Sequence, residues 1–238
     1  MMLEILKRRK CIALLMDPDN YSPGDIKGLF EVESGCKPDM FLVGGSLTKV
    51  NPEGLVLELK ENFDIPVILF PGSLLQLTGK ADGILFISLI SGRNPELLIG
   101  NHVLAAPYLK KAGTGIIPTG YILVNCGIRT SVEYMSQTEA IPSNKTDIAV
   151  ATALAGEMLG LKAIYLEGGS GASHPVPPAM IRAVRDAISV PLIVGGGLKT
   201  GKDIKQAYQS GADLVVIGNG FESNPGLLKE ACSIRNSL

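Results

Sequence analysis

Short apolar runs recur along the chain at spacings that suit alternating strands and helices. Eight of them are rich in Ile, Val and Leu, and runs of this length and composition are typical of strands buried in a parallel sheet. They cover residues 11–16, 40–43, 66–70, 83–87, 120–124, 163–166, 191–194 and 214–217.

Segments with helical periodicity separate most of these runs. They cover residues 23–33, 52–61, 95–112, 146–159, 177–187, 200–210 and 225–234. Several begin with a start signal, such as the Ser22 N-cap ahead of Pro23, or an Asn-Pro pair. Alternating strands and helices favour a parallel sheet, and eight repeats predict a closed (β/α)8 TIM barrel that occupies residues 1–238 as a single domain.

Two connections depart from a regular repeat. Residues 71–82 are too few between their glycines for a full crossover helix, so the third connection should be short or irregular. Residues 125–145 form the longest segment without helical periodicity, and loops of this length are often lids or binding elements.

Composition narrows the class of protein. Of 238 residues, 46% are hydrophobic and only 5% aromatic, a balance expected where aliphatic side chains fill helices and buried parallel strands. The 22 basic and 23 acidic residues nearly cancel, so no global basic field is present to attract nucleic acid.

The cysteines and the N-terminal segment indicate where in the cell the protein is located. Four scattered cysteines without a C-x-x-C pair argue against a zinc site or a disulfide framework and favour buried thiols in a reducing cytoplasm. They are Cys11, Cys36, Cys126 and Cys232. The apolar run at 11–16 is too short for a signal peptide, and no run approaches the length of a membrane span, so we expect a soluble cytoplasmic protein.

Carboxylates and hydroxyls follow the first two strands. Asp17 precedes Pro18, which favours an extended conformation and can place Asp17 and Asp19 on one side. Such carboxylates suit Mg²⁺, and the hydroxyl of Ser46 or Thr48 could bind the metal or a metal-bound diphosphate. A polar turn after each strand is the alternative interpretation.

Glycine-rich segments follow the last three strands. "YLEGGSGA" carries Glu167 beside small residues, and Gly195–Gly197 and Gly218–Gly220 follow the seventh and eighth strands. Loops at these two places are the usual phosphate cradle of a TIM barrel, where backbone N–H groups contact the phosphate. Neither histidine belongs to a ligand cluster: His102 lies in an apolar helical stretch, and His174 lies at the end of a loop.

The segments "LLMDPDN", "FLVGGSLT", "YLEGGSGA", "IVGGGLKT" and "VVIGNG" resemble, in this order, geranylgeranylglyceryl phosphate synthases and the related heptaprenylglyceryl phosphate synthases. The resemblance covers essentially the whole chain. It implies a TIM barrel with an altered third helical segment. It also implies Mg²⁺-dependent transfer of a prenyl group from its diphosphate to the 3-hydroxyl of sn-glycerol 1-phosphate.

The resemblance also implies roles for individual residues. Asp17 and Ser46 match the metal-binding positions, and Glu167 would accept the proton of the glycerol hydroxyl, so Asp17 and Glu167 are the candidate catalytic residues. The remaining matches are to the glycerol phosphate site: Tyr165, Leu166, Glu167, Gly168, Gly169, Ser170, Gly171, Gly196, Gly197, Gly218 and Asn219. A homo-oligomer, either a dimer or a hexamer, is implied as well.

The chain departs from the family in two respects. Some relatives carry a lysine two positions before the metal aspartate, where this chain has Leu15. Members of the family limit the prenyl length with bulky residues deep in the trench, and because this chain has no Trp, that residue cannot be identified. Geranylgeranyl diphosphate is the expected substrate, because the "DPD" and "GGSGA" segments resemble the archaeal and wider bacterial branch. Residues 83–90 and 97–122 are apolar enough to line a prenyl trench.

Two other interpretations remain open at this point. The glycine-rich loops after the seventh and eighth strands fit flavin- or sugar-phosphate-binding barrels, which act as isomerases or oxidoreductases, almost as well. A non-catalytic barrel that binds a phosphorylated metabolite is the third, although it does not explain why Asp17 and Glu167 both follow strands on the active face.

Overall fold

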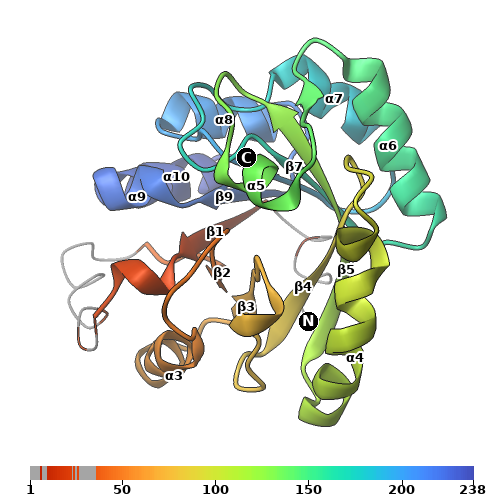
Figure 1. The fold of residues 1–238 in the computed structure, drawn as a ribbon. Coiled ribbons are helices and arrows are strands. Elements are labelled where there is room, and N and C mark those ends of the chain that lie inside the picture. Colours follow the sequence, from red (N-terminus) through yellow and green to blue (C-terminus); the bar gives the residue numbers. More distant parts are fainter. Residues whose placement is uncertain (1–5, 7–9, 23, 25, 27–35) are drawn as a thin grey trace.

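Eight parallel strands close into a barrel, which confirms the predicted fold class (Figure 1). The computed structural model describes residues 6, 10–22, 24, 26 and 36–238. The barrel strands are β1 (Cys11–Met16), β2 (Met40–Val43), β3 (Val67–Leu69), β4 (Gly83–Leu89), β5 (Gly115–Asn125), β7 (Ala163–Glu167), β8 (Leu192–Gly195) and β9 (Leu214–Ile217). Each strand pairs with the next, and β1 pairs with β9 to close the ring.

Helices surround the barrel at most of the predicted places. They are α3 (Glu53–Asn62), η3 (Glu96–Gly100, a π-helical turn) continuing into α4 (Asn101–Ala112), α6 (Thr146–Met158), α7 (Pro178–Ala187), α8 (Gly201–Gln209), α9 (Asn219–Ser223) and α10 (Gly226–Asn236). The helix predicted over 23–33 lies outside the described residues, apart from Gly24 and Ile26. In the described part of the chain, no helix is both long and apolar enough to cross a bilayer.

Strand alternation divides the buried side chains into two layers. On β7, for example, Ala163 and Tyr165 point into the barrel, whereas Ile164 and Leu166 pack outward against helices. The same period-2 pattern holds for the other strands, because successive side chains of a strand point to opposite faces. Both layers are apolar, which is why the strands read as continuous hydrophobic runs in the sequence.

The third connection is short, as predicted. Between β3 and β4 the chain forms only the 3₁₀ turn η2 (Leu74–Gln76) instead of an α-helix. The side chain of Gln76 is buried and donates to the Gly45 carbonyl over 2.8 Å, while its Oε1 accepts the Gly72 N–H over 3.1 Å. These bonds tie the turn to the loop after β2.

The segment at 125–145 is more ordered than the sequence suggested. It contains the helix α5 (Ser131–Ser136) and the two-residue strand β6 (Ile141–Pro142), which pairs with the end of β5. Thr130 and Glu133 form a capping box, in which each side chain bonds to the other residue's backbone N–H. The prediction of a long non-helical loop is therefore wrong for this segment.

The prediction that all four cysteines are unpaired thiols is wrong for two of them. Cys36 and Cys232 form a disulfide that joins the segment before β2 to α10, with their Cα atoms 6.1 Å apart. The two positions are 196 residues apart in sequence and become neighbours because the barrel closes. Cys11 and Cys126 are buried and lie outside this disulfide, as expected.

Reduction of this disulfide should destabilise the protein. Because the bond closes a loop of nearly the whole chain, its loss should lower the free energy of unfolding by about 2–5 kcal/mol. Urea unfolding with and without a thiol reductant measures the loss, and Cys232→Ser is the control that should not respond to reductant. Equal unfolding midpoints of the wild-type protein in both conditions would contradict the assignment.

Candidate active site

Two carboxylates extend the inward-facing rows of their strands at the C-terminal end of the barrel. Glu167 is the last residue of β7 and follows the inward positions Ala163 and Tyr165. Asp17 directly follows β1 with an extended backbone, two positions after the inward-facing Leu15. Since all strands are parallel, both carboxylates lie at the same end of the barrel, the end at which TIM-barrel active sites are built.

Glu167 is a buried carboxylate with three hydrogen-bond donors. Its Oε1 accepts the Gly169 N–H over 2.6 Å, and the hydroxyls of Tyr165 and Tyr121 donate to it. Burial raises the pKa of the Glu167 carboxyl above its ordinary value, although the three donors act in the opposite direction. A carboxylate in this state is closer in pKa to neutral pH than an exposed glutamate, which suits a general base.

An aromatic cluster lies beneath Glu167 inside the barrel. The rings of Phe70 and Tyr165 are stacked at 5.5 Å, and Tyr121 meets Tyr165 edge-on at 5.1 Å. Burial and the charge of Glu167 raise the pKa of both tyrosines well above the usual value, so the hydroxyls keep their protons and remain donors. The cluster therefore fixes the position of the Glu167 side chain.

Glycines after β8 make room for this arrangement. A Cβ on Gly195 would collide with the Tyr165 hydroxyl, and a Cβ on Gly196 would collide with Glu167 Oε1. Gly196 and Gly197 also have positive φ angles, of 79° and 72°, which side chains rarely adopt. Gly195 is thus required by packing, and Gly196 by packing as well as by backbone conformation.

Four backbone N–H groups near Glu167 have no acceptor within the described residues. They belong to Ser170, Gly171, Gly196 and Gly197. These residues lie in the loops after β7 and β8, which are joined by the bond from the Gly168 N–H to the Gly195 carbonyl over 2.9 Å. Unbonded amides in turns with positive φ form a concave surface that suits an anion such as phosphate.

The loop after β9 completes this surface. The Ser170 hydroxyl donates to Asn219 Oδ1 over 3.3 Å, which brings α9 against the loop after β7. Leu15 lies against Gly218, so no charged side chain is supplied from that position of β1. Lys199 donates from its Nζ to the Ala172 carbonyl over 2.8 Å and places a cation beside the same loop.

Asp17 and Asp19 have different surroundings. Both oxygens of Asp19 accept the Lys49 N–H at 2.9 Å, and one also accepts the Val50 N–H, so Asp19 serves to hold the loop after β2. Asp17 Oδ1 accepts the Asp19 N–H over 3.0 Å, whereas its Oδ2 faces Gly45, where a Cβ would lie only 2.7 Å away. Asp17 therefore stabilises the turn through Oδ1, whereas a bound metal would contact Oδ2.

The surroundings of Asp17 suit a cation. Burial, together with the charges of Asp19 and Glu222, raises the pKa of the Asp17 carboxyl, and no cationic side chain of the described residues pairs with it. Ser46 follows Gly45 in the adjacent loop and is half-buried. The described residues hold no cluster of three His, Cys, Asp or Glu side chains that could enclose a metal alone. A metal here would thus complete its shell with water or substrate oxygens.

The segment after β5 packs onto the glycine-rich loop after β7. The Ser173 N–H donates to the Cys126 carbonyl over 3.0 Å, and a Cβ on Gly169 would collide with Thr130, the cap of α5. Burial and Glu167 raise the pKa of the Cys126 thiol to about 12, so this thiol stays protonated. The predicted binding loop thus lies against the candidate site through α5.

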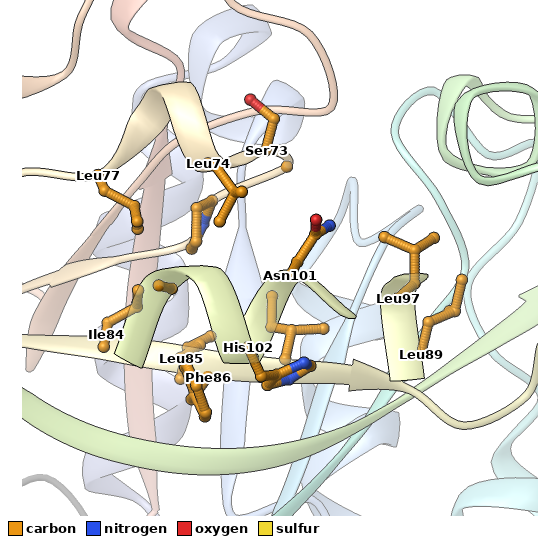
Figure 2. Close-up of a pocket in the computed structure, with 14 residues that line it drawn as sticks. Ser73, Leu74, Leu77, Ile84, Leu85, Phe86, Leu89, Leu97, Asn101 and His102 are labelled. Atoms are coloured by element: carbon orange, nitrogen blue, oxygen red, sulfur yellow. The ribbon is translucent and has the colours of Figure 1, made fainter. Parts of the chain in front are cut away.

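An apolar groove runs along the barrel where the third helix would otherwise pack (Figure 2). One side is formed by η2 and the other by α4, with strand β4 as the floor. Its walls include Leu74, Leu77, Ile84, Phe86, Leu97, Asn101, His102 and Ala105. The groove takes the place of the missing helix, and of the two predicted trench segments it uses residues 84–89 and 97–105 only.

Not every predicted residue faces the site. The Leu166 side chain points outward into the layer between barrel and helices, so only its backbone is on the site's side of the chain. His174 is exposed, and His102 is buried in α4 with its Nε2 3.2 Å from the Ser88 hydroxyl. The positions of both histidines agree with the sequence interpretation.

Sequence reasoning missed Tyr121, Phe70 and Gln76. Tyr121 is paired with Tyr165 in the register between β5 and β7, so the inward alternation of the two strands was a usable signal. Phe70 could have been found in the same way after β3. Nothing in the sequence around Gln76 indicates that its buried amide would tie two loops together.

The chain is similar to a known protein family, to named enzymes and to solved structures. Residues 3–234 match the PcrB family. Geranylgeranylglyceryl phosphate synthases of Spirosoma linguale and Chitinophaga pinensis are each 48% identical, over 96% and 93% of this chain and 92% and 88% of their own. The crystal structure of (S)-3-O-geranylgeranylglyceryl phosphate synthase from Thermoplasma acidophilum in complex with sn-glycerol-1-phosphate superimposes with a TM-score of 0.91. It is 30% identical, over 100% of this chain and 97% of that one.

Gly196→Ala should be much more damaging than an alanine at another glycine of similar φ. Gly113 has a φ of 72°, close to the 79° of Gly196, but a Cβ there meets nothing within 4 Å, so Gly113→Ala has only the backbone cost of about 1 kcal/mol. Gly196→Ala adds a collision with Glu167 and should lower the free energy of unfolding by at least about 2 kcal/mol more. Urea unfolding compares the two, and equal losses would show that the loop has room for a side chain.

Proposed function

The chain belongs to the PcrB family, and we propose that it is a prenyltransferase that joins the 3-hydroxyl of sn-glycerol 1-phosphate to C1 of geranylgeranyl diphosphate. The products are geranylgeranylglyceryl phosphate and diphosphate. The observation that carries the proposal is the buried Glu167 carboxylate beside four unbonded amides of the loops after β7 and β8. The relatives carry this activity in their names, and one of them binds sn-glycerol-1-phosphate on the same fold.

The glycine-rich loops would hold the phosphate of sn-glycerol 1-phosphate. The N–H groups of Ser170, Gly171, Gly196 and Gly197 are free to donate to its oxygens, and Lys199 adds positive charge beside them. Binding through backbone amides fixes the phosphate without flexible side chains. The glycerol part is then held near Glu167, which converts the transfer into a reaction between positioned groups.

Glu167 would act as the general base. As the bond forms between the glycerol 3-oxygen and C1 of the prenyl group, the bond between C1 and the diphosphate oxygen breaks, and the hydroxyl proton passes to Glu167. The hydroxyls of Tyr121 and Tyr165 keep the carboxylate in place before it takes the proton. Its raised pKa makes proton transfer more favourable than to an ordinary glutamate.

Mg²⁺ is the proposed cofactor, with Asp17 and Ser46 as its protein ligands. The fit rests on Asp17 Oδ2, which faces the loop after β2, and on burial and the nearby charges of Asp19 and Glu222, which together raise the pKa of Asp17. When bound, the ion would neutralise charge on the leaving diphosphate. Asp19 is less suited, because its oxygens accept the backbone N–H groups of Lys49 and Val50.

The groove between η2 and α4 would take the prenyl chain. Its walls are mostly aliphatic and aromatic, and they include Ser73 and Leu97, which follow β3 and β4 in the chain. A chain bound there would enter beside the reacting centre and extend along the barrel wall.

We also propose a cytoplasmic location and a homo-oligomer, either a dimer or a hexamer. The homo-oligomer rests on the resemblance to the family. The cytoplasmic location rests on the sequence pattern, and the Cys36–Cys232 disulfide removes one of its grounds, the expectation that all cysteines are reduced. The protein would act on one water-soluble and one lipid substrate without a membrane span of its own within the described residues.

The direct test is product formation. Radiolabelled sn-glycerol 1-phosphate is incubated with Mg²⁺ and prenyl diphosphates of several lengths, and the product is extracted into organic solvent. We expect extractable label with geranylgeranyl diphosphate, and much less with sn-glycerol 3-phosphate as acceptor. Absence of extractable label with every prenyl length would refute the proposal.

Glu167→Gln should lower turnover by about 100-fold or more, because an amide cannot take the hydroxyl proton. The affinity for sn-glycerol 1-phosphate, measured by calorimetry, should change far less. Glu133→Gln is a matched change at another buried glutamate, and since Gln also serves in a capping box, its turnover should stay near that of the wild type. Similar losses in both variants would show that Glu167 has no special part in the reaction.

Asp17→Asn should raise the Mg²⁺ concentration needed for half-maximal turnover by about tenfold or more, since it removes a charged ligand. Glycerol phosphate affinity without metal should be unaffected. Asp19→Asn is the adjacent control: it should weaken the hold on the loop after β2 and lower stability more than Mg²⁺ affinity. If Asp19→Asn shifts the Mg²⁺ dependence more than Asp17→Asn does, the ligand assignment is reversed.

A further inference from the structure

Helix α4 presents an apolar face to solvent. Ile99 of η3 and Val103, Leu104 and Tyr108 of α4 are 60%, 63%, 66% and 47% exposed. They follow one another at spacings of four, one and four residues and so occupy about half of the helix circumference, opposite His102, Ala105 and Leu109, which are buried. We call these four residues the outer face of α4. An exposed apolar stripe of this kind marks an interaction surface.

The C-terminal end of this face is basic. Lys110 and Lys111 lie in the last turn of α4, and Lys80 follows Gly79, where a Cβ would lie 2.9 Å from Ala112. Within the described residues, none of the three lysines forms an ion pair, whereas the nearby Lys60 pairs with Asp82 over 2.6 Å. Glu96 is the one acidic residue in the first turn, at the other end. The face is therefore apolar along its length and positively charged at one end.

The same helix separates this face from the prenyl groove. Its buried side contributes Asn101, His102 and Ala105 to the groove wall, while η2 forms the opposite wall (Figure 2). On η2, Leu75 is 86% exposed between two leucines that line the groove. Both walls thus carry apolar side chains on the outside as well as on the inside.

We propose that the outer face of α4, with Lys80, Lys110 and Lys111, docks on the surface of an anionic phospholipid bilayer. An apolar helix face can sink into the headgroup region, and each nearby lysine adds electrostatic attraction to anionic lipids. Tyr108 suits the boundary, since its ring is apolar and its hydroxyl polar. The inference rests on the proposed function, because a bilayer against this helix places the groove beside the phase that holds prenyl substrate and lipid product.

Charge favours a bilayer over a second copy of the chain. If two copies paired through this face in antiparallel fashion, the three lysines of one would lie at the first turn of the other, where Glu96 is the only acidic residue of η3 and α4. Anionic headgroups can neutralise all three lysines. A second copy is therefore the competing occupant that the experiment must detect.

The test is flotation of the full chain with vesicles of phosphatidylcholine alone or mixed with phosphatidylglycerol. The wild type should float with the mixed vesicles, and less so as salt is raised. Val103→Ser combined with Leu104→Ser should weaken binding about tenfold or more. Lys110→Gln and Lys111→Gln should each weaken binding about fivefold, on anionic vesicles only.

A matched control uses another exposed apolar pair, Met158 and Leu159 at the end of α6, which are 82% and 79% exposed. Met158→Ser combined with Leu159→Ser should leave vesicle binding unchanged. Thermal melting shows whether each variant is folded. Failure of the wild type to float with anionic vesicles, or equal loss in the α4 and α6 double variants, overturns the proposal.

Two further measurements separate this inference from others. Turnover of a short, water-soluble allylic diphosphate without vesicles should be equal in the wild type and the α4 double variant. If no variant turns over but vesicle binding still depends on Val103 and Leu104, the proposed function fails and the docking surface stands. If light scattering shows that the α4 double variant loses a subunit contact while the wild type ignores vesicles, the face is an interface between copies, and the docking proposal is overturned.

Discussion

The site depends on keeping one carboxylate, Glu167, charged in the interior of an apolar barrel. A buried charge is costly unless it is hydrogen-bonded, and here the cost is offset by two tyrosine hydroxyls and one backbone N–H. Each donor places a demand on its surroundings. The tyrosines need the ring of Phe70 as packing partner, and the N–H of Gly169 needs a tight turn after β7. Glycines at 195 and 196 follow, because any side chain there would strike Tyr165 or Glu167.

The same turns that serve Glu167 also leave amides for a phosphate. The N–H groups of Gly168 and Gly169 donate to the Gly195 carbonyl and to Glu167. The N–H groups of the next two residues, Ser170 and Gly171, have no acceptor within the described residues. The proposed proton acceptor and the proposed phosphate site are therefore parts of one loop. The missing helix between β3 and β4 likewise has two consequences. The turn η2 holds the loop of Ser46 through Gln76, and the wall of β4 is left open to the groove in which we propose that the prenyl chain binds.

The sequence was informative where a pattern is local. The strands at 11–16, 40–43 and 214–217 have the bounds that their apolar runs predicted, and the loops at their ends could be placed on one face because the strands are parallel. Helix α5 was missed although Thr130 and Glu133 have capping-box spacing, because the turn-like residues around it hid so short a helix. The Cys36–Cys232 bond could not be predicted, since only barrel closure brings those distant positions together. Tyr121 was placed in a strand, but its contact with Glu167 depends on the register between β5 and β7.

The measurement that tests the central claim most directly is a ¹³C NMR titration of the Glu167 carboxyl in the folded protein, with Glu167→Gln used to assign the signal. If the carboxylate is buried as described, its pKa will lie above the ordinary glutamate value of 4.5, because burial outweighs the three donors. The Tyr121 and Tyr165 hydroxyls should remain protonated throughout the titration. A Glu167 pKa at or below 4.5 would mean that the carboxylate is solvated and would contradict its assignment as the buried proton acceptor.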